Sequence, residues 1–259
     1  MLEWVFYGCL LLLFIWLLAV PMIAVFTAPV LALENMTNNV SCKTLKRVAK
    51  QLVKSGTLPP DQHAKLAGAI GLGSDLLEPL AAAITIQKES AAKITRAHAV
   101  RVFITTAVSQ SGHLDAVAVL IMNFKLVRTL VDHFGYRPPL PTLIKIYSQI
   151  FFATIVAEEA NDVDFSGVLS HVVGGGVNLV PGLSLITDSV FDGSINAMFT
   201  LRVGYVTQKY LLNAGRNLSK SDIRKAANES AGREIKHVMK ESVPFFPTAI
   251  GAAIQRFFI

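Results

Sequence analysis

The sequence predicts an all-α protein in which an N-terminal transmembrane helix is followed by a membrane-associated cytoplasmic helical bundle. Of its 259 residues, 52% are hydrophobic and only 16% are charged, against about 25% charged residues in a soluble domain. The mean hydropathy is +0.49. No segment alternates with the period of two that is typical of a half-buried strand, whereas apolar residues recur at helical spacing along most of the chain.

The strongest membrane signal lies at the start of the chain. The thirty residues from Trp4 to Leu33 carry no charge, and about twenty apolar residues are enough to cross the hydrocarbon core of a bilayer. Pro21 and Pro29 predict a kink in the second half of this segment. A cleaved signal peptide would have a basic start and a shorter apolar core. We therefore predict a retained anchor over residues 1–34.

A cluster of basic residues follows this segment and predicts its orientation. Membrane helices are flanked by Lys and Arg on the cytoplasmic side, so we expect the N-terminus outside and the bulk of the chain in the cytoplasm. Apolar residues between the cations fall at helical spacing, which predicts an amphipathic helix. Two interpretations stay open: the helix binds anionic lipids, or it is an ordinary solvated helix. The basic residues are Lys43, Lys46, Arg47, Lys50 and Lys54.

The remainder of the chain reads as one helix after another. Gly and Pro residues separate the apolar periodic segments, and Gly135 is expected to end one of them. The last helix is charged, with an apolar stripe that predicts packing on the rest of the protein. The predicted helices cover residues 61–70, about 74–110, 113–134, 142–160, 183–212 and 219–242. The stripe of the last helix is Ile223, Ala227, Ala231, Ile235, Val238 and Met239.

Residues 165–187 carry no charge, but a helix break divides them into pieces too short to span a bilayer. The break consists of Gly174, Gly175, Gly176, Pro181 and Gly182. The helix after it carries three candidate functional charges. In lipid, unpaired charges are costly and mark functional sites, whereas inside a protein bundle they are interfacial groups with ordinary partners. The three charges are Asp188, Asp192 and Arg202.

The order of features resembles a known family. The segment 123–135, Asn-Phe-Lys-Leu-Val-Arg-Thr-Leu-Val-Asp-His-Phe-Gly, precedes a hydrophobic helix, a Gly-rich break with Val180-Pro-Gly182, and a helix ending in Thr200-Leu-Arg-Val-Gly204. Over roughly residues 97–214 the chain resembles the YcjF-like inner-membrane proteins, which share a domain of unknown function. The resemblance implies a bacterial inner (cytoplasmic) membrane location and a connection to a small GTPase, because the same domain occurs fused to or beside such GTPases.

The sequence contains no recognisable catalytic or nucleotide-binding motif. The glycines at 174–176 are followed by no Lys, which a phosphate-binding P-loop requires, and the six His are scattered without metal-ligand spacing. No aromatic residues are interleaved with the basic cluster, as nucleic-acid binding would favour. We therefore predict that the chain is not an enzyme and has no catalytic residue, cofactor, metal site or nucleic-acid partner.

These observations predict four regions and two candidate functions. The first candidate is a membrane-anchored scaffold or adaptor that positions a partner, with a small GTPase as the candidate, at the cytoplasmic face of the inner membrane. The second is a small multi-pass transporter or channel-like protein with Asp188 and Asp192 on a cation or proton path. A homo-oligomer stays open for both. The predicted regions are 1–34 (anchor), 35–96 (basic juxtamembrane and linking helices), 97–214 (hydrophobic YcjF-like domain) and 215–259 (amphipathic helix and apolar tail).

Overall fold

The computed structural model describes most of the helical part of the chain. It covers residues 42–72, 76–108, 112–138, 140–155, 184–212 and 220–246, together with scattered residues between 8 and 26. In this part, seven α-helices and one short 3₁₀ helix, η1, carry the fold and no strand is present. The all-α prediction is therefore confirmed. The elements are α2 (Cys42–Ser55), α3 (Pro60–Leu72), α4 (Leu77–Val108), α5 (Gly112–Phe134), α6 (Leu140–Ile155), α8 (Ser184–Leu212), α9 (Lys220–Ser242) and η1 (Val243–Phe245).

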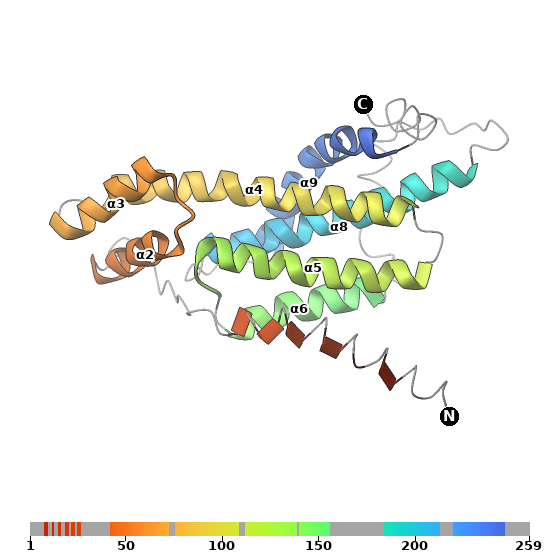
Figure 1. Cartoon of the computed structure of the whole chain (residues 1–259), viewed down its shortest axis with the longest axis horizontal. Helices are drawn as coiled ribbons and strands as arrows, with labels where there is room; N and C mark the ends of the chain where they lie inside the picture. The colour runs from red at the N-terminus through yellow and green to blue at the C-terminus, as the bar shows by residue number, and fades with distance from the viewer. Residues whose placement is uncertain are drawn as a thin grey trace.

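The three helices α4, α5 and α8 lie alongside one another and form the centre of the bundle (Figure 1). The helix α8 contacts α4, α5, α6 and α9, so other helices surround it on several sides. Figure 1 shows α5 between α4 and α6, and it shows α2 and α3 near the start of α4. Elements far apart in the sequence therefore share one bundle.

Several predicted helix boundaries are confirmed to within a few residues. The helix α5 ends at Phe134, and Gly135 follows with φ +72°, a left-handed conformation that glycine adopts without steric cost. The helix α8 ends at Leu212, as predicted. The helix α6 begins two residues earlier than expected, at Leu140, because Pro141 is tolerated in a first helical turn. The predicted continuation over 156–160 lies outside the described residues.

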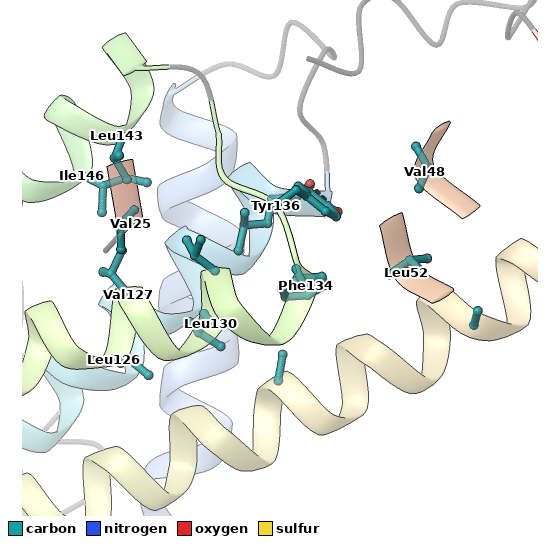
Figure 2. Close-up of a cluster of buried hydrophobic side chains, with 14 of the residues drawn as sticks. Val25, Val48, Leu52, Leu126, Val127, Leu130, Phe134, Tyr136, Leu143 and Ile146 are labelled. Atoms are coloured by element: carbon teal, nitrogen blue, oxygen red, sulfur yellow. Dashed lines mark hydrogen bonds between the residues drawn. The ribbon is translucent and has the colours of Figure 1, made fainter. Parts of the chain in front are cut away.

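The buried side chains form two adjoining cores. One core joins α2, α3, α5 and α6 to the first half of α4, with Leu52, Leu130 and Phe134 among its most buried members (Figure 2). Val25, from the N-terminal segment, lies in the same core beside Leu143. The second core joins the second half of α4 to α8, α9 and η1.

The predicted apolar stripe of the last helix is confirmed by its burial. Each of its six residues has at most 5% of its surface exposed in α9: Ile223, Ala227, Ala231, Ile235, Val238 and Met239. The stripe packs against α4 and α8. The prediction that this helix docks on the rest of the protein was therefore correct.

The predicted transmembrane helix is not supported. Among the residues that the structure describes, no helix combines the length and the apolar character needed to cross a bilayer. Most of the predicted span, residues 4–33, lies outside the described residues, so the anchor stays a prediction.

Candidate functional site

The predicted basic cluster lies on α2, and the structure separates its two faces. Val48, Ala49 and Leu52 are buried in the protein core, whereas Arg47, Lys50 and Lys54 are exposed. The apolar face therefore contacts protein and is unavailable to lipid, while the cations point outward. Of the other two basic residues, Lys46 is half-buried and the side chain of Lys43 lies outside the described set. We call the exposed residues Arg47, Lys50 and Lys54 the basic stripe.

Hydrogen bonds fix α2 to the end of α5. The side-chain amide of Gln51 donates to the carbonyl oxygen of Gly135. The hydroxyl of Thr57 donates to the carbonyl oxygen of His133 over 3.0 Å and accepts a hydrogen bond from the Gln87 amide of α4. We call this set of contacts the polar junction. The end of α2 and the residues that follow it are thus tied to α5 and α4, and this holds the basic stripe at a fixed orientation on the bundle.

His133 lies inside this junction. Its Nε2 atom is 3.3 Å from the carbonyl oxygen of Gln87. Burial lowers the pKa of His133, and the contact with the Gln87 carbonyl opposes this shift. A lowered pKa favours the neutral imidazole, which fits a structural hydrogen-bonding role at the junction.

Of the three candidate charges of α8, the two whose side chains the structure describes lie far apart. Asp192 is exposed and Arg202 is half-buried, and ten residues of helix separate them by about 15 Å. The side chain of Asp188 lies outside the described set, as does the predicted break at Gly174–Gly176 and Pro181-Gly182. Burial, and then the charge of Arg224 on α9, lower the pKa of Arg202. Arg202 therefore lies in the contact region between α8 and α9.

The helices α4 and α8 approach each other closely. A Cβ atom added at Gly204 would lie 2.6 Å from Oγ1 and 3.0 Å from Cβ of Thr95, and one at Gly193 would lie 2.9 Å from Cβ of Ala107. The two helices therefore run antiparallel with their backbones close together. The sequence carries a signal for this contact, because small residues recur at helical spacing at Gly193, Ala197, Thr200 and Gly204.

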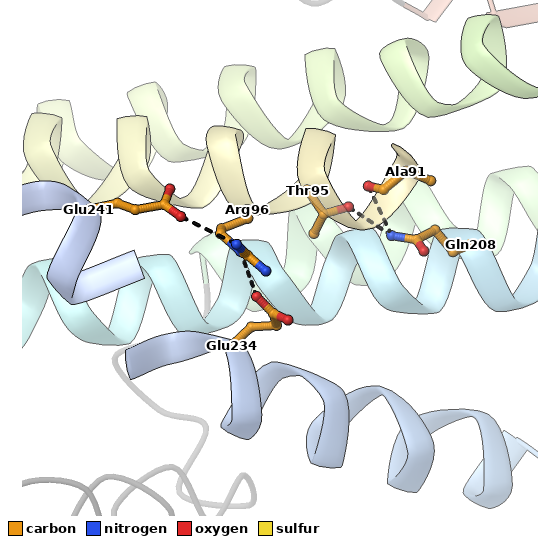
Figure 3. A network of polar contacts seen from close by, with 6 residues as sticks. All are labelled: Ala91, Thr95, Arg96, Gln208, Glu234 and Glu241. Atoms are coloured by element: carbon orange, nitrogen blue, oxygen red, sulfur yellow. Dashed lines mark hydrogen bonds and ion pairs between the residues drawn. The ribbon is translucent and has the colours of Figure 1, made fainter. Parts of the chain in front are cut away.

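Polar side chains secure this contact and the position of α9 (Figure 3). The buried amide of Gln208 donates to Oγ1 of Thr95 over 2.8 Å and to the carbonyl oxygen of Ala91 over 3.3 Å. Arg96, on the same helix as Thr95, forms ion pairs of 2.6 Å with Glu234 and 3.3 Å with Glu241 of α9. The hydrogen bond with Glu234 contributes most to raising the pKa of Arg96. These contacts join α4, α8 and α9 into one unit.

Several polar side chains of the described helices bond across helix contacts, as Gln208 and Thr95 do. Within these helices, no group of three His, Cys, Asp or Glu side chains is placed to hold a metal ion. The feature best placed to meet another molecule is the basic stripe, because it combines exposure, like charge and a fixed orientation.

A family model matches the chain over residues 73–236, which include α4, α5, α6, α8 and most of α9. The matched family is described as a domain of unknown function, DUF697. The chain belongs to this family. No curated protein and no solved structure matches the chain. The DUF697 match begins and ends beyond the predicted limits of 97–214, and it takes in the whole of α4, including Arg96 and Thr95.

Proposed function

We propose that this DUF697 protein is a membrane-anchored adaptor of the YcjF-like type, located at the bacterial inner membrane with its N-terminus outside. The helical bundle recruits a partner at the cytoplasmic face, and a small GTPase is the candidate, as the resemblance implies. The observation that supports this proposal most directly is the basic stripe on α2. It follows the uncharged segment 4–33 in sequence, it is exposed, and its helix is fixed to the bundle.

Electrostatic attraction is the force expected between the basic stripe and lipid. Cations next to a membrane-inserted segment are attracted to anionic headgroups, with about 1 kcal/mol for each Lys or Arg near the surface. The apolar face of α2 is already buried in the core. The stripe therefore contributes by charge alone and holds the bundle against the membrane surface.

The transporter alternative is less well supported by the surroundings of α8. A helix that lines an ion path in lipid needs lipid-compatible neighbours. Here α9 packs along α8, and its outward side chains are charged. The exposed charged residues of α9 include Lys225, Glu229, Arg233, Lys236 and Lys240. Such a face is suited to water, so we place this side of the bundle outside the membrane.

Anchoring is tested by comparing the full chain with a chain that begins at residue 35. Because this deletion also removes Val25 from the core, circular dichroism first checks that the shorter chain keeps its helices. We expect the full chain to remain with membranes after an alkaline wash and the shorter chain to be released. The shorter chain should bind vesicles that contain phosphatidylglycerol. A variant in which Glu replaces all three of Arg47, Lys50 and Lys54 should bind more than a hundredfold more weakly, since three cations contribute about 3 kcal/mol.

The matched control replaces Arg233, Lys236 and Lys240 on α9 with Glu, because this change removes the same number of exposed cations from another helix. We expect the control to bind vesicles much more tightly than the α2 variant. Equal losses in both variants would show that only net charge matters and would contradict a role for the basic stripe. Release of the full chain by the alkaline wash would contradict the anchor.

The adaptor role needs a separate test. The full chain is reconstituted in vesicles, and purified Era-like or dynamin-like GTPases of the source organism are added with GTP or GDP. We expect one of them to float with vesicles that contain the chain and not with empty vesicles. No recruitment in either nucleotide state, together with a cation flux that is lost in Asp192→Asn, would overturn the proposal in favour of the transporter.

A further inference from the structure

Two large apolar residues on α6 are exposed at its first turns. Leu140 is 44% exposed and Ile144 is 55% exposed, whereas Leu143 and Ile146 of the same helix are buried. The helix therefore has a buried apolar side toward α5 and a second apolar side that no described residue covers. Exposed apolar residues gathered on one face are typical of an interaction surface.

The N-terminal segment reaches the bundle at the same place. Val25 is fully buried beside Leu143 and Ile146 (Figure 2), and Met22 and Phe26 pack against the same core. Two residues before Val25, Ile23 is 60% exposed. The segment predicted to enter the membrane therefore contacts α6 on its buried side, next to the turns that carry Leu140 and Ile144.

The basic stripe lies at this end of the bundle too. The polar junction fixes α2 to Gly135, at the end of α5, and α6 begins only five residues later, at Leu140. Lys145 follows Ile144 and is half-buried; a Lys next to apolar residues extends its amine to the headgroups while its methylenes stay in apolar surroundings. Apolar side chains flanked by cations are the combination that binds the interface of an anionic bilayer.

From this placement we propose that the exposed face of α6, formed by Leu140 and Ile144, inserts into the headgroup region of an anionic lipid bilayer. This inference rests on the proposed anchoring and adds which face of the bundle meets the membrane. The cations of the basic stripe at this end of the bundle complement anionic headgroups, and residues 22–26 of the predicted anchor contact α6. Both observations favour lipid over a second protein chain as the occupant.

The experiment uses the full chain with Cys9 and Cys42 replaced by Ser. A single Cys is placed at Leu140 or Ile144 and labelled with an environment-sensitive fluorophore. The control label is at Ala97, an exposed position on α4. Figure 1 shows α4 on the other side of α5 from α6. Each protein is reconstituted in phosphatidylethanolamine and phosphatidylglycerol vesicles that contain a doxyl-labelled lipid. Flotation reports membrane attachment, and circular dichroism checks that each variant keeps its helices.

We expect labels at both α6 positions to emit at shorter wavelength, to be quenched by the doxyl lipid and to resist iodide in the aqueous phase. The label at Ala97 should be quenched by iodide only. If the chain floats but the α6 labels behave like Ala97, the inference is wrong and the anchoring stands. If the α6 labels resist both quenchers, a second protein chain covers this face, and the inference is again wrong. If the chain does not float, the anchoring fails and the inference fails with it.

Discussion

Replacing Gly204 with Ala tests the close contact between α4 and α8. The added methyl group would lie 2.6 Å from Oγ1 and 3.0 Å from Cβ of Thr95, and Thr95 is fully buried. The Cβ atom belongs to the rigid start of the side chain, so rotation about χ1 cannot remove the whole conflict. The two backbones must move apart, or Thr95 must give up its hydrogen bond with Gln208.

The expected loss of stability follows from three terms. Overpacking a buried contact costs about 1–3 kcal/mol, and loss of the hydrogen bond from Gln208 to Thr95 costs about 1 kcal/mol more. Ala favours a helix over Gly by about 1 kcal/mol, which offsets part of this cost. We therefore expect Gly204→Ala to lower the free energy of unfolding by about 1–3 kcal/mol, or the melting temperature by about 2–4 °C per kcal/mol.

The assay is urea unfolding of the full chain in mild detergent, followed by circular dichroism. The matched control is Gly68→Ala in α3, where a Cβ atom would meet nothing within 4 Å; this variant should gain up to about 1 kcal/mol. Thr95→Ala removes two of the atoms that Gly204→Ala would strike. The double variant should therefore lose less stability than the sum of the single variants, with a coupling of about 0.5–3 kcal/mol. Additive losses, or a Gly204→Ala variant as stable as Gly68→Ala, would refute the close contact.

Three further changes test how the bundle is held together. Arg96→Met removes both ion pairs to α9. Since Arg96 is partly exposed, we expect the free energy of unfolding to fall by at most about 1 kcal/mol per pair, and by less at high salt. A loss that does not depend on salt in urea unfolding would contradict this expectation. Ala231 is fully buried on α9, so Ala231→Leu should cost about 1–3 kcal/mol, and a variant of unchanged stability would contradict the packing. Burial, with Arg101 and Lys125 nearby, lowers the pKa of His98 from 6.5 to about 4. As the pH falls, His98 is therefore protonated in the unfolded chain before it is protonated in the folded protein. The free energy of unfolding then falls as the pH drops from 6.5 toward 4. His98→Gln should remove the part of this loss of stability that His98 causes. The measurement is the unfolding midpoint at several pH values between 6.5 and 4, and an unchanged dependence on pH would show that other groups cause the loss.

Sequence patterns predicted most of the described helices because each pattern is local. The apolar residues of α9 recur at helical spacing, and an apolar stripe on an otherwise charged helix is typical of a helix that packs against the rest of the protein. The helix α5 ends before Gly135 because a residue in the left-handed conformation interrupts the helical hydrogen bonds. Such signals depend on a few consecutive residues and need no knowledge of the fold.

The partner of each helical face could not be predicted in the same way. The pattern on α2 showed an apolar face opposite a basic one, and both lipid and solvent were considered as its surroundings. The structure places Val48 and Leu52 in the protein core instead. Likewise, Gly204 faces Thr95 across more than a hundred residues of sequence. Periodicity shows that a face is apolar or small, but it does not show which distant helix covers it.

The two surfaces proposed to meet the membrane should respond differently to salt. The basic stripe can attract lipid only through charge, because the apolar side of α2 is buried in the core. Its contribution should therefore weaken as the Debye length shortens, from about 10 Å at 0.1 M salt to about 3 Å at 1 M. Leu140 and Ile144 would bind by removing apolar surface from water, which salt does not screen. High salt should thus weaken, but not abolish, the binding of a chain that begins at residue 35 to anionic vesicles, while labels on α6 of the full chain remain in contact with lipid. If high salt also removes the α6 labels of the full chain from contact with lipid, the basic stripe holds α6 at the surface, and charge is the main attachment of the bundle.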